Sequence, residues 1–96
     1  MKKFVYVFYG YEEPTPEVMK AWGEWFAVVG KKFVDSGTPF GPGRVVTKSG
    51  ASDVSKDESP ITAYSIVSAE NMEEAEKLLE GCPIIDSVRI YESMSM

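Results

Sequence analysis

The chain has 96 residues, 44% of them hydrophobic and 26% charged, a size that suits one small globular domain over residues 1–96. It is too short for a doubly wound dinucleotide-binding fold or an eightfold βα barrel. The net charge of −5 argues against a nucleic-acid partner. With no histidine and one cysteine, we expect no metal site, no cofactor and no internal disulfide.

The longest uninterrupted apolar run, Phe4–Tyr9, is far shorter than the roughly 20 residues that a membrane-spanning helix needs. Lys2 and Lys3 are followed by alternating aromatic residues and valines that stop at Gly10, which is not the pattern of a secretory leader. We therefore expect a cytoplasmic protein without a membrane partner.

The segment Lys3–Gly10 predicts a strand in the middle of a sheet. Its residues are β-branched or aromatic, and apolar side chains fall on both faces of the strand. A strand that is covered on one face alternates apolar with polar residues, so this pattern indicates cover on both faces.

Thr15-Pro16-Glu17 predicts the start of a helix, with a hydroxyl N-cap, proline at the first helical position and an acid in the first turn. We expect the helix to stop at Gly37, which places Asp35 in its last turn. An apolar stripe at helical spacing predicts the buried face: Val18, Trp22, Trp25, Phe26, Val29 and Phe33.

The middle of the chain carries weaker signals. Two prolines and two glycines in Thr38–Gly43 predict a rigid loop. A short strand is expected over Arg44–Lys48, a polar loop over Ser49–Ser59, and a longer strand over Pro60–Ser68.

Asn71 is expected to cap a second helix, which Gly81 and Pro83 end. Its apolar face is predicted to hold Met72, Ala75, Leu78, Leu79 and Cys82, and burial there would make Cys82 an unreactive thiol. Ser87–Glu92 predicts the last strand, and residues 93–96 read as a flexible tail.

The predicted order β-α-β-β-α-β is that of α+β folds of the ferredoxin-like type. We expect a four-stranded antiparallel sheet with the first and third strands inside and two helices on one face. The other face would then expose aromatic and aliphatic side chains, which in a small protein usually mark an interface. The sequence therefore predicts a homodimer that packs sheet against sheet as a dimeric α+β barrel.

A ligand site is expected in a cleft between the first helix and the loop after it, lined by Trp22, Phe26, Asp35, Arg44 and Tyr64. A carboxylate at a helix C-terminus is disfavoured by the helix dipole, so we expect Asp35 to pair with Arg44. Arg44 could offer its guanidinium to an anionic ligand while Trp22 or Tyr64 covers the apolar part. The alternative is a surface salt bridge that only fixes the loop.

Several stretches together resemble the YCII-related (DGPF-type) domain family, and the resemblance covers nearly the whole chain. It rests on Ala21–Phe26, Asp35–Arg44, Tyr64–Ala69, Gly81–Pro83 and Val88–Glu92. It implies a ferredoxin-like dimeric α+β barrel among small bacterial cytosolic proteins that mostly lack an assigned activity. Members proposed as enzymes carry a histidine on the first helix with an aspartate partner. Here the comparable place falls near Phe26, and Asp35 corresponds to the acid.

Three functions follow as hypotheses. The first is a dimer that binds a small, partly apolar, anionic ligand without histidine-based catalysis. The second is a cofactor-independent lyase or isomerase in which Asp35 is the base, the only catalytic residue that the sequence suggests. The third is a regulatory module that binds a partner through the acidic second helix, with Glu73, Glu76 and Glu80 exposed.

Overall fold

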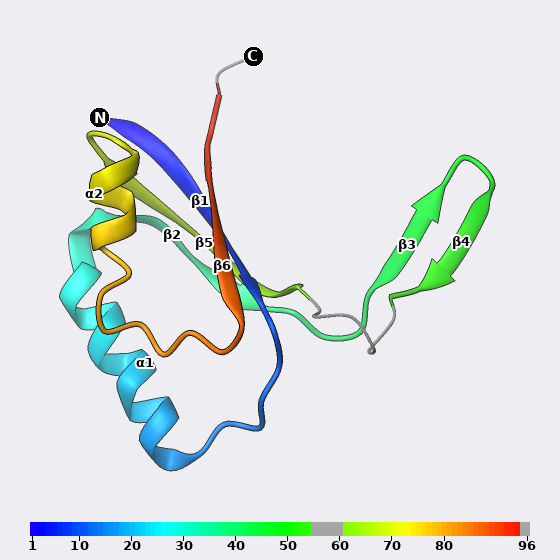
Figure 1. Cartoon of the computed structure of the whole chain (residues 1–96), viewed down its shortest axis with the longest axis horizontal. Helices are drawn as coiled ribbons and strands as arrows, with labels where there is room; N and C mark the ends of the chain where they lie inside the picture. Colours follow the sequence, from blue (N-terminus) through cyan, green and yellow to red (C-terminus); the bar gives the residue numbers. More distant parts are fainter. Residues whose placement is uncertain (55–60, 95–96) are drawn as a thin grey trace.

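A computed structural model describes residues 1–54 and 61–94 (Figure 1). Its elements are, in chain order, β1 (Lys2–Tyr9), α1 (Pro16–Val29), the 3₁₀ turn η1 (Gly30–Lys32), β2 (Phe33–Pro39), β3 (Arg44–Thr47), β4 (Gly50–Asp53), β5 (Ile61–Ala69), α2 (Met72–Lys77) and β6 (Ser87–Glu92). Four strands form an antiparallel sheet in the order β2-β5-β1-β6, and among the described residues β3 pairs with β4 alone. The prediction of an α+β fold with a four-stranded antiparallel sheet and two helices is confirmed.

The two helices form a layer on one side of the sheet, and the β3–β4 hairpin projects on the other side, away from the sheet (Figure 1). Strands β1 and β5 are the inner strands of the sheet, as their apolar sequences predict. The core lies between the sheet and the helices and consists of Phe4, Tyr6, Phe8, Trp25, Val29, Val67, Ala69 and Ala75.

Two aromatic side chains fasten the helices to the sheet. Trp25 of α1 is 2% exposed, and its ring contacts the rings of Tyr6 and Phe8 on β1 at centroid distances of 6.3 Å and 6.2 Å. Its indole Nε1 donates to the carbonyl of Leu78, just after α2, over 2.7 Å. The hydroxyl of Tyr6 donates to the carbonyl of Ala75 within α2. These bonds satisfy buried carbonyls at the end of a short helix, where backbone partners run out.

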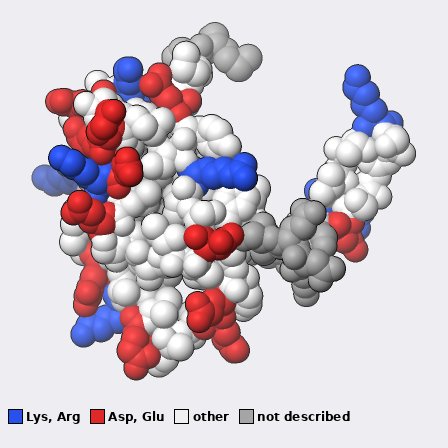
Figure 2. Space-filling view, in the orientation of Figure 1, with Lys and Arg blue, Asp and Glu red and all other residues white. Residues whose placement is uncertain are grey.

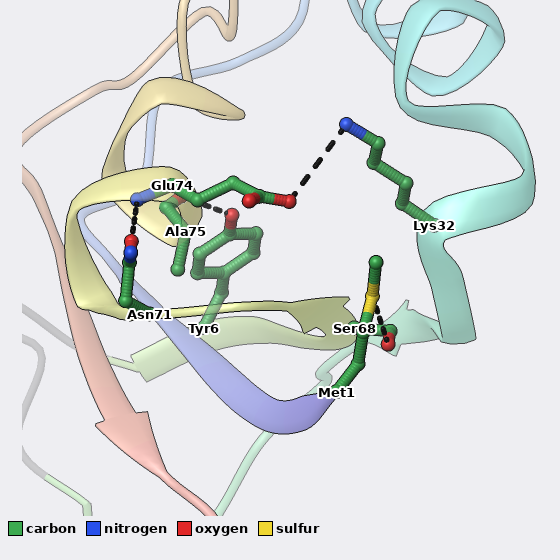
Figure 3. A network of polar contacts seen from close by, with 7 residues as sticks. All are labelled: Met1, Tyr6, Lys32, Ser68, Asn71, Glu74 and Ala75. Atoms are coloured by element: carbon green, nitrogen blue, oxygen red, sulfur yellow. Dashed lines mark hydrogen bonds and ion pairs between the residues drawn. The ribbon is translucent and has the colours of Figure 1, made fainter.

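The start of α2 is fixed by the cap that the sequence predicts (Figure 3). The side chain of Asn71 accepts a hydrogen bond from the backbone N–H of Glu74 over 2.8 Å. The carboxylate of Glu74 in turn lies 3.9 Å from the ammonium of Lys32 in η1, which links the two helical segments. The predicted cap of α1 is also confirmed, since Thr15 accepts from the N–H of Val18.

The first helix ends earlier than predicted, and this moves Asp35 into a strand. Gly30 closes α1 with a positive φ of 49°, and its N–H bonds to the carbonyl of Phe26. After one 3₁₀ turn, Phe33 and Asp35 pair with β5 opposite Val67 and Ile66. The prediction of a helix up to Gly37 was wrong because strand pairing with β5 satisfies this backbone, which local sequence cannot reveal.

The edge strands of the sheet are β2 and β6, and Arg44–Thr47 is one strand of a hairpin outside the sheet. The prediction that this segment is the second strand of the four-stranded sheet was therefore wrong, because residues 33–39 take that place. The partner strand β4 lies within the predicted loop over Ser49–Ser59, of which residues 55–59 are outside the described part, as is Pro60. On the second helix, Met72 was expected to be buried and is 41% exposed. Of the expected tail, residues 93 and 94 are described and carry no helix or strand.

The exposure of the α1 side chains predicts which of them stabilises the fold. Trp25→Ala should lower the free energy of unfolding by about 3–5 kcal/mol, because a large buried ring is replaced by a cavity. Phe26 is 37% exposed, so Phe26→Ala should cost clearly less, although the sequence pattern placed both rings on the buried stripe. Urea denaturation of both variants measures the difference, with the exposed Glu24→Ala as the control expected to stay within about 0.5 kcal/mol. Equal losses for the two aromatic residues would contradict this packing.

Candidate functional site

The face of the sheet that points away from the helices, here called the open face, carries the most informative side chains. Along β1 and β5 successive residues alternate between the two faces, so the neighbours of the buried Tyr6 and Ser65 belong to the open face. Its residues on the four sheet strands include Asp35, Val5, Val7, Tyr9, Tyr64, Ile66, Arg89 and Tyr91.

The strand register aligns these residues into rows across the sheet. Val7 lies opposite Tyr64 on one side and Arg89 on the other, while Thr38 lies opposite Tyr64. Because neighbouring strands are about 4.8 Å apart, Tyr64 and Arg89 are separated by roughly 10 Å with an apolar side chain between them. This spacing suits a small molecule with one anionic end and an apolar body.

A bulge in β2 builds the polar end of this row. The Tyr64 hydroxyl donates to Oδ2 of Asp35 over 2.8 Å, and the N–H of Gly37 donates to Oδ1 over 2.8 Å. Gly37 has a φ of 84°, and a Cβ built on it would lie 1.6 Å from the carbonyl oxygen of Tyr64. Only glycine fits at that position, so the bulge that orients Asp35 depends on it. The ring of Phe40 stacks on Tyr64 at 5.8 Å.

These hydrogen bonds set the protonation states of the pair. The bond from Tyr64, followed by that from Gly37, lowers the pKa of the Asp35 carboxyl, and the same carboxylate raises the pKa of the Tyr64 phenol. At neutral pH Asp35 is therefore a carboxylate and Tyr64 a protonated phenol. Because the Tyr64 proton is already donated to Asp35, the pair offers a ligand acceptor oxygens only. A carboxylate with a lowered pKa is also a weak base.

The cationic end of the row is Arg89. Its guanidinium carbon lies 4.7 Å from the ring centroid of Tyr9, which is cation–π geometry. The pKa of Arg89 is raised, first by a hydrogen bond to the Tyr91 side chain and second by electrostatic interaction with Tyr9. The planar guanidinium therefore lies over the Tyr9 ring and beside the Tyr91 hydroxyl, and its geometry suits bidentate recognition of a carboxylate or phosphate.

The five residues expected to line one cleft occupy three places. Asp35 and Tyr64 are joined on the open face. Trp22 and Phe26 lie beside each other on α1, on the opposite face of the sheet, with ring centroids 6.1 Å apart. Arg44 lies at the base of the hairpin, 3.7 Å from Asp53. The expected ion pair between Asp35 and Arg44 is not formed, because β2 carries Asp35 into the sheet before the chain leaves it for the hairpin.

Two open grooves lie beside the helices. One, of about 540 Å³, runs between the end of α1 and the edge strand β2; of the five predicted residues only Phe26 lines it. The other, of about 810 Å³, lies between α2 and β6. Its apolar lining includes Leu79, Ile84, Val88 and Ile90, and its acidic lining includes Glu73, Glu76 and Glu80.

Sequence reasoning missed the cluster that Arg89 forms with Tyr9 and Tyr91. A signal was present, because Arg89 and Tyr91 are two residues apart in a predicted strand and must share a face. The sequence could not reveal the strand register, which pairs Arg89 with Val7 and Tyr91 with Val5. Phe40 was placed in the predicted loop Thr38–Gly43, whereas its N–H bonds to the carbonyl of Thr62 and so continues the pairing of β2 with β5.

Cys82 is half-buried, and burial raises the pKa of its thiol to about 12, which agrees with the prediction of an unreactive cysteine. Within residues 1–54 and 61–94, no three His, Cys, Asp or Glu side chains gather as metal ligands would. In the same residues no helix is both long and apolar enough to span a membrane.

The hydrogen bond between Tyr64 and Asp35 should be visible in the pKa values of the two groups. In the folded protein Tyr64 should titrate above the ordinary value of about 10, and its phenol should therefore favour folding until the pH rises through that raised pKa. The Asp35 carboxylate should favour folding above its ordinary pKa of about 4, an effect lost as the pH falls through the lowered value. Asp35→Asn should move the Tyr64 pKa back toward 10. The NMR shifts of the tyrosine ring carbons, recorded against pH, measure this change. Asp53→Asn, on the exposed hairpin, is the control, and an unchanged Tyr64 titration in Asp35→Asn would contradict the bond.

No family model, no curated protein and no solved structure matches this chain.

Proposed function

We propose that this protein is a homodimeric binding protein for a small, partly apolar, anionic ligand, held on the open face and not processed by histidine-based catalysis. The observation that carries the proposal is the row across the sheet, in which Arg89 and Tyr64 flank Val7. A mostly apolar floor with a few polar groups at its margins is the composition that small-molecule sites usually have.

A ferredoxin-like architecture is part of the proposal, with the β3–β4 hairpin as an insertion between its second and third strands. The order β2-β5-β1-β6 and the position of both helices on one face support it. Kinship with YCII-related domains rests on the sequence stretches quoted above and is proposed on that basis.

Dimerisation through the open face is supported by the side chains found there. Val5, Val7, Tyr9, Tyr64 and Ile66 are all half-buried in the single chain, and they form a continuous patch across the two inner strands. A soluble monomer rarely leaves such a patch uncovered. Packing two of these faces together would produce the dimeric α+β barrel and would enclose a ligand between the two sheets.

The enzymatic alternative is weakened by the state of Asp35. A base for a lyase or isomerase needs a pKa near the working pH, and the bonds from Tyr64 and Gly37 move the pKa of Asp35 away from it. A partner-binding role for α2 has one supporting observation, the acidic groove between α2 and β6. Both alternatives rank below ligand binding because neither uses Arg89.

Light scattering after gel filtration tests the dimer. The mass should be about twice the 10.7 kDa of one chain at micromolar concentration. Val5→Glu places a charge in the middle of the open face and should yield a monomer that remains folded by circular dichroism. A wild-type mass equal to one chain would contradict the dimeric barrel.

Ligand binding is tested with benzoate, salicylate and hexanoate by NMR of the tyrosine rings. We expect saturable shifts at Tyr9, Tyr64 and Tyr91, and an affinity about tenfold lower in Arg89→Gln, since a charge-assisted contact is lost. Arg44→Gln should bind like the wild type, because this arginine lies on the hairpin. If instead the indole signal of Trp22 responds and Arg44→Gln loses binding, the cleft expected from the sequence is the site. No saturable response to any of the three acids would refute the proposal.

A further inference from the structure

The β3–β4 hairpin contributes nothing to the core described above. Every residue of both strands is exposed, and the hairpin stands off the rest of the molecule (Figure 2). Within it, Val45 pairs with Ser52 and Val46 with Ala51, and one backbone bond from Val54 to Gly43 extends the ladder by a rung.

A hairpin in this situation lacks a source of stability. Two-stranded sheets in water are marginal unless a third layer covers their apolar face. Val46 is nevertheless 76% exposed, and its cross-strand partner Ala51 lies on the same face of the hairpin. Exposed β-branched residues on a protruding ribbon are what a surface that packs against another chain presents.

The charge of the hairpin is opposite to that of the chain as a whole. Between residues 44 and 53, Arg44 and Lys48 outnumber Asp53, which gives a net charge of +1, whereas the whole chain carries −5. Lys48 lies in the turn between the strands, and Figure 2 shows a basic side chain at the tip, while acidic side chains interspersed with basic ones lie over the rest of the molecule. A second copy of the same chain is therefore an electrostatically complementary partner for this hairpin.

The position of the hairpin indicates where that copy lies. The hairpin projects on the side of the sheet opposite the helices, which is the side of the open face (Figure 1). A copy packed on the open face would lie beside the hairpin, and twofold symmetry would place its own hairpin along the first molecule.

We propose that the β3–β4 hairpin is an arm that clasps the second subunit of a homodimer, with Val46 as its apolar anchor and Lys48 directed to the partner's acidic surface. The proposal rests on the dimer proposed above and assigns it a second contact beyond the open face. It also accounts for the exposure of Val46 on a ribbon that lies outside the core.

The test compares dimer dissociation constants by analytical ultracentrifugation for pairs of variants that differ only in location. Val46→Ser should weaken the dimer about tenfold, whereas Val28→Ser, on the 80% exposed valine of α1, should leave it unchanged. Lys48→Glu should weaken the dimer and remove part of its salt dependence, while Lys31→Glu in η1 should do neither. Hydrogen exchange of residues 44–53 should be slower in the wild-type dimer than in the monomer obtained by dilution.

The outcomes separate this arm from the dimer itself. A wild-type chain that is monomeric overturns both. A wild-type dimer that withstands Val46→Ser and Lys48→Glu, with equal exchange of residues 44–53 in dimer and monomer, overturns the arm and leaves the open-face dimer standing. If Val46→Ser only unfolds the hairpin, the Lys48→Glu variant still decides, because a charge at the tip leaves the strand pairing intact.

Discussion

The fold depends on two aromatic donors that reach from the core to the end of α2. The Tyr6 hydroxyl bonds to the carbonyl of Ala75, and the Trp25 indole bonds to the carbonyl of Leu78. A helix of six residues has too few backbone bonds of its own to be stable in isolation. The two side chains supply donors where the helix ends, and their rings fill the space between sheet and helices. Burial raises the pKa of Tyr6 strongly, which keeps this donor protonated.

This arrangement determines which face of the sheet remains available. Once Phe4, Tyr6 and Phe8 point toward the helices, alternation commits Val5 and Val7 to the other face. The open face is therefore a consequence of how the core is packed. It is apolar because β1 has apolar side chains on both faces, and the two helices cover only one of them. The chemistry of the proposed site is confined to its margins, with Asp35 at one edge of the sheet and Arg89 at the other.

The β2 bulge positions the polar side chains of the proposed site. Gly37 approaches the backbone of Tyr64 so closely that no side chain fits, and its N–H donates to Oδ1 of Asp35. The same distortion brings the Asp35 carboxylate within hydrogen-bond distance of the Tyr64 hydroxyl. Beyond the bulge, β2 resumes its pairing with β5 at Thr38 and Pro39, and the N–H of Phe40 still bonds to the carbonyl of Thr62 before the chain leaves the sheet for the hairpin.

The sequence by itself determined the elements that local chemistry controls. The caps at Thr15 and Asn71, the two inner strands and the buried position of Trp25 all follow from residue type and periodicity, because these signals act over a few residues. It could not determine the end of α1 or the path of residues 33–53, where pairing between distant strands decides the outcome. Asp35 illustrates the difference, since the local pattern is compatible with a helical turn and only β5 makes the segment a strand. The tertiary structure decided the rest, because strand register is set by the packing of the whole sheet. It joined Tyr64 to Asp35, separated Arg44 from both, and placed Arg89 opposite Val7.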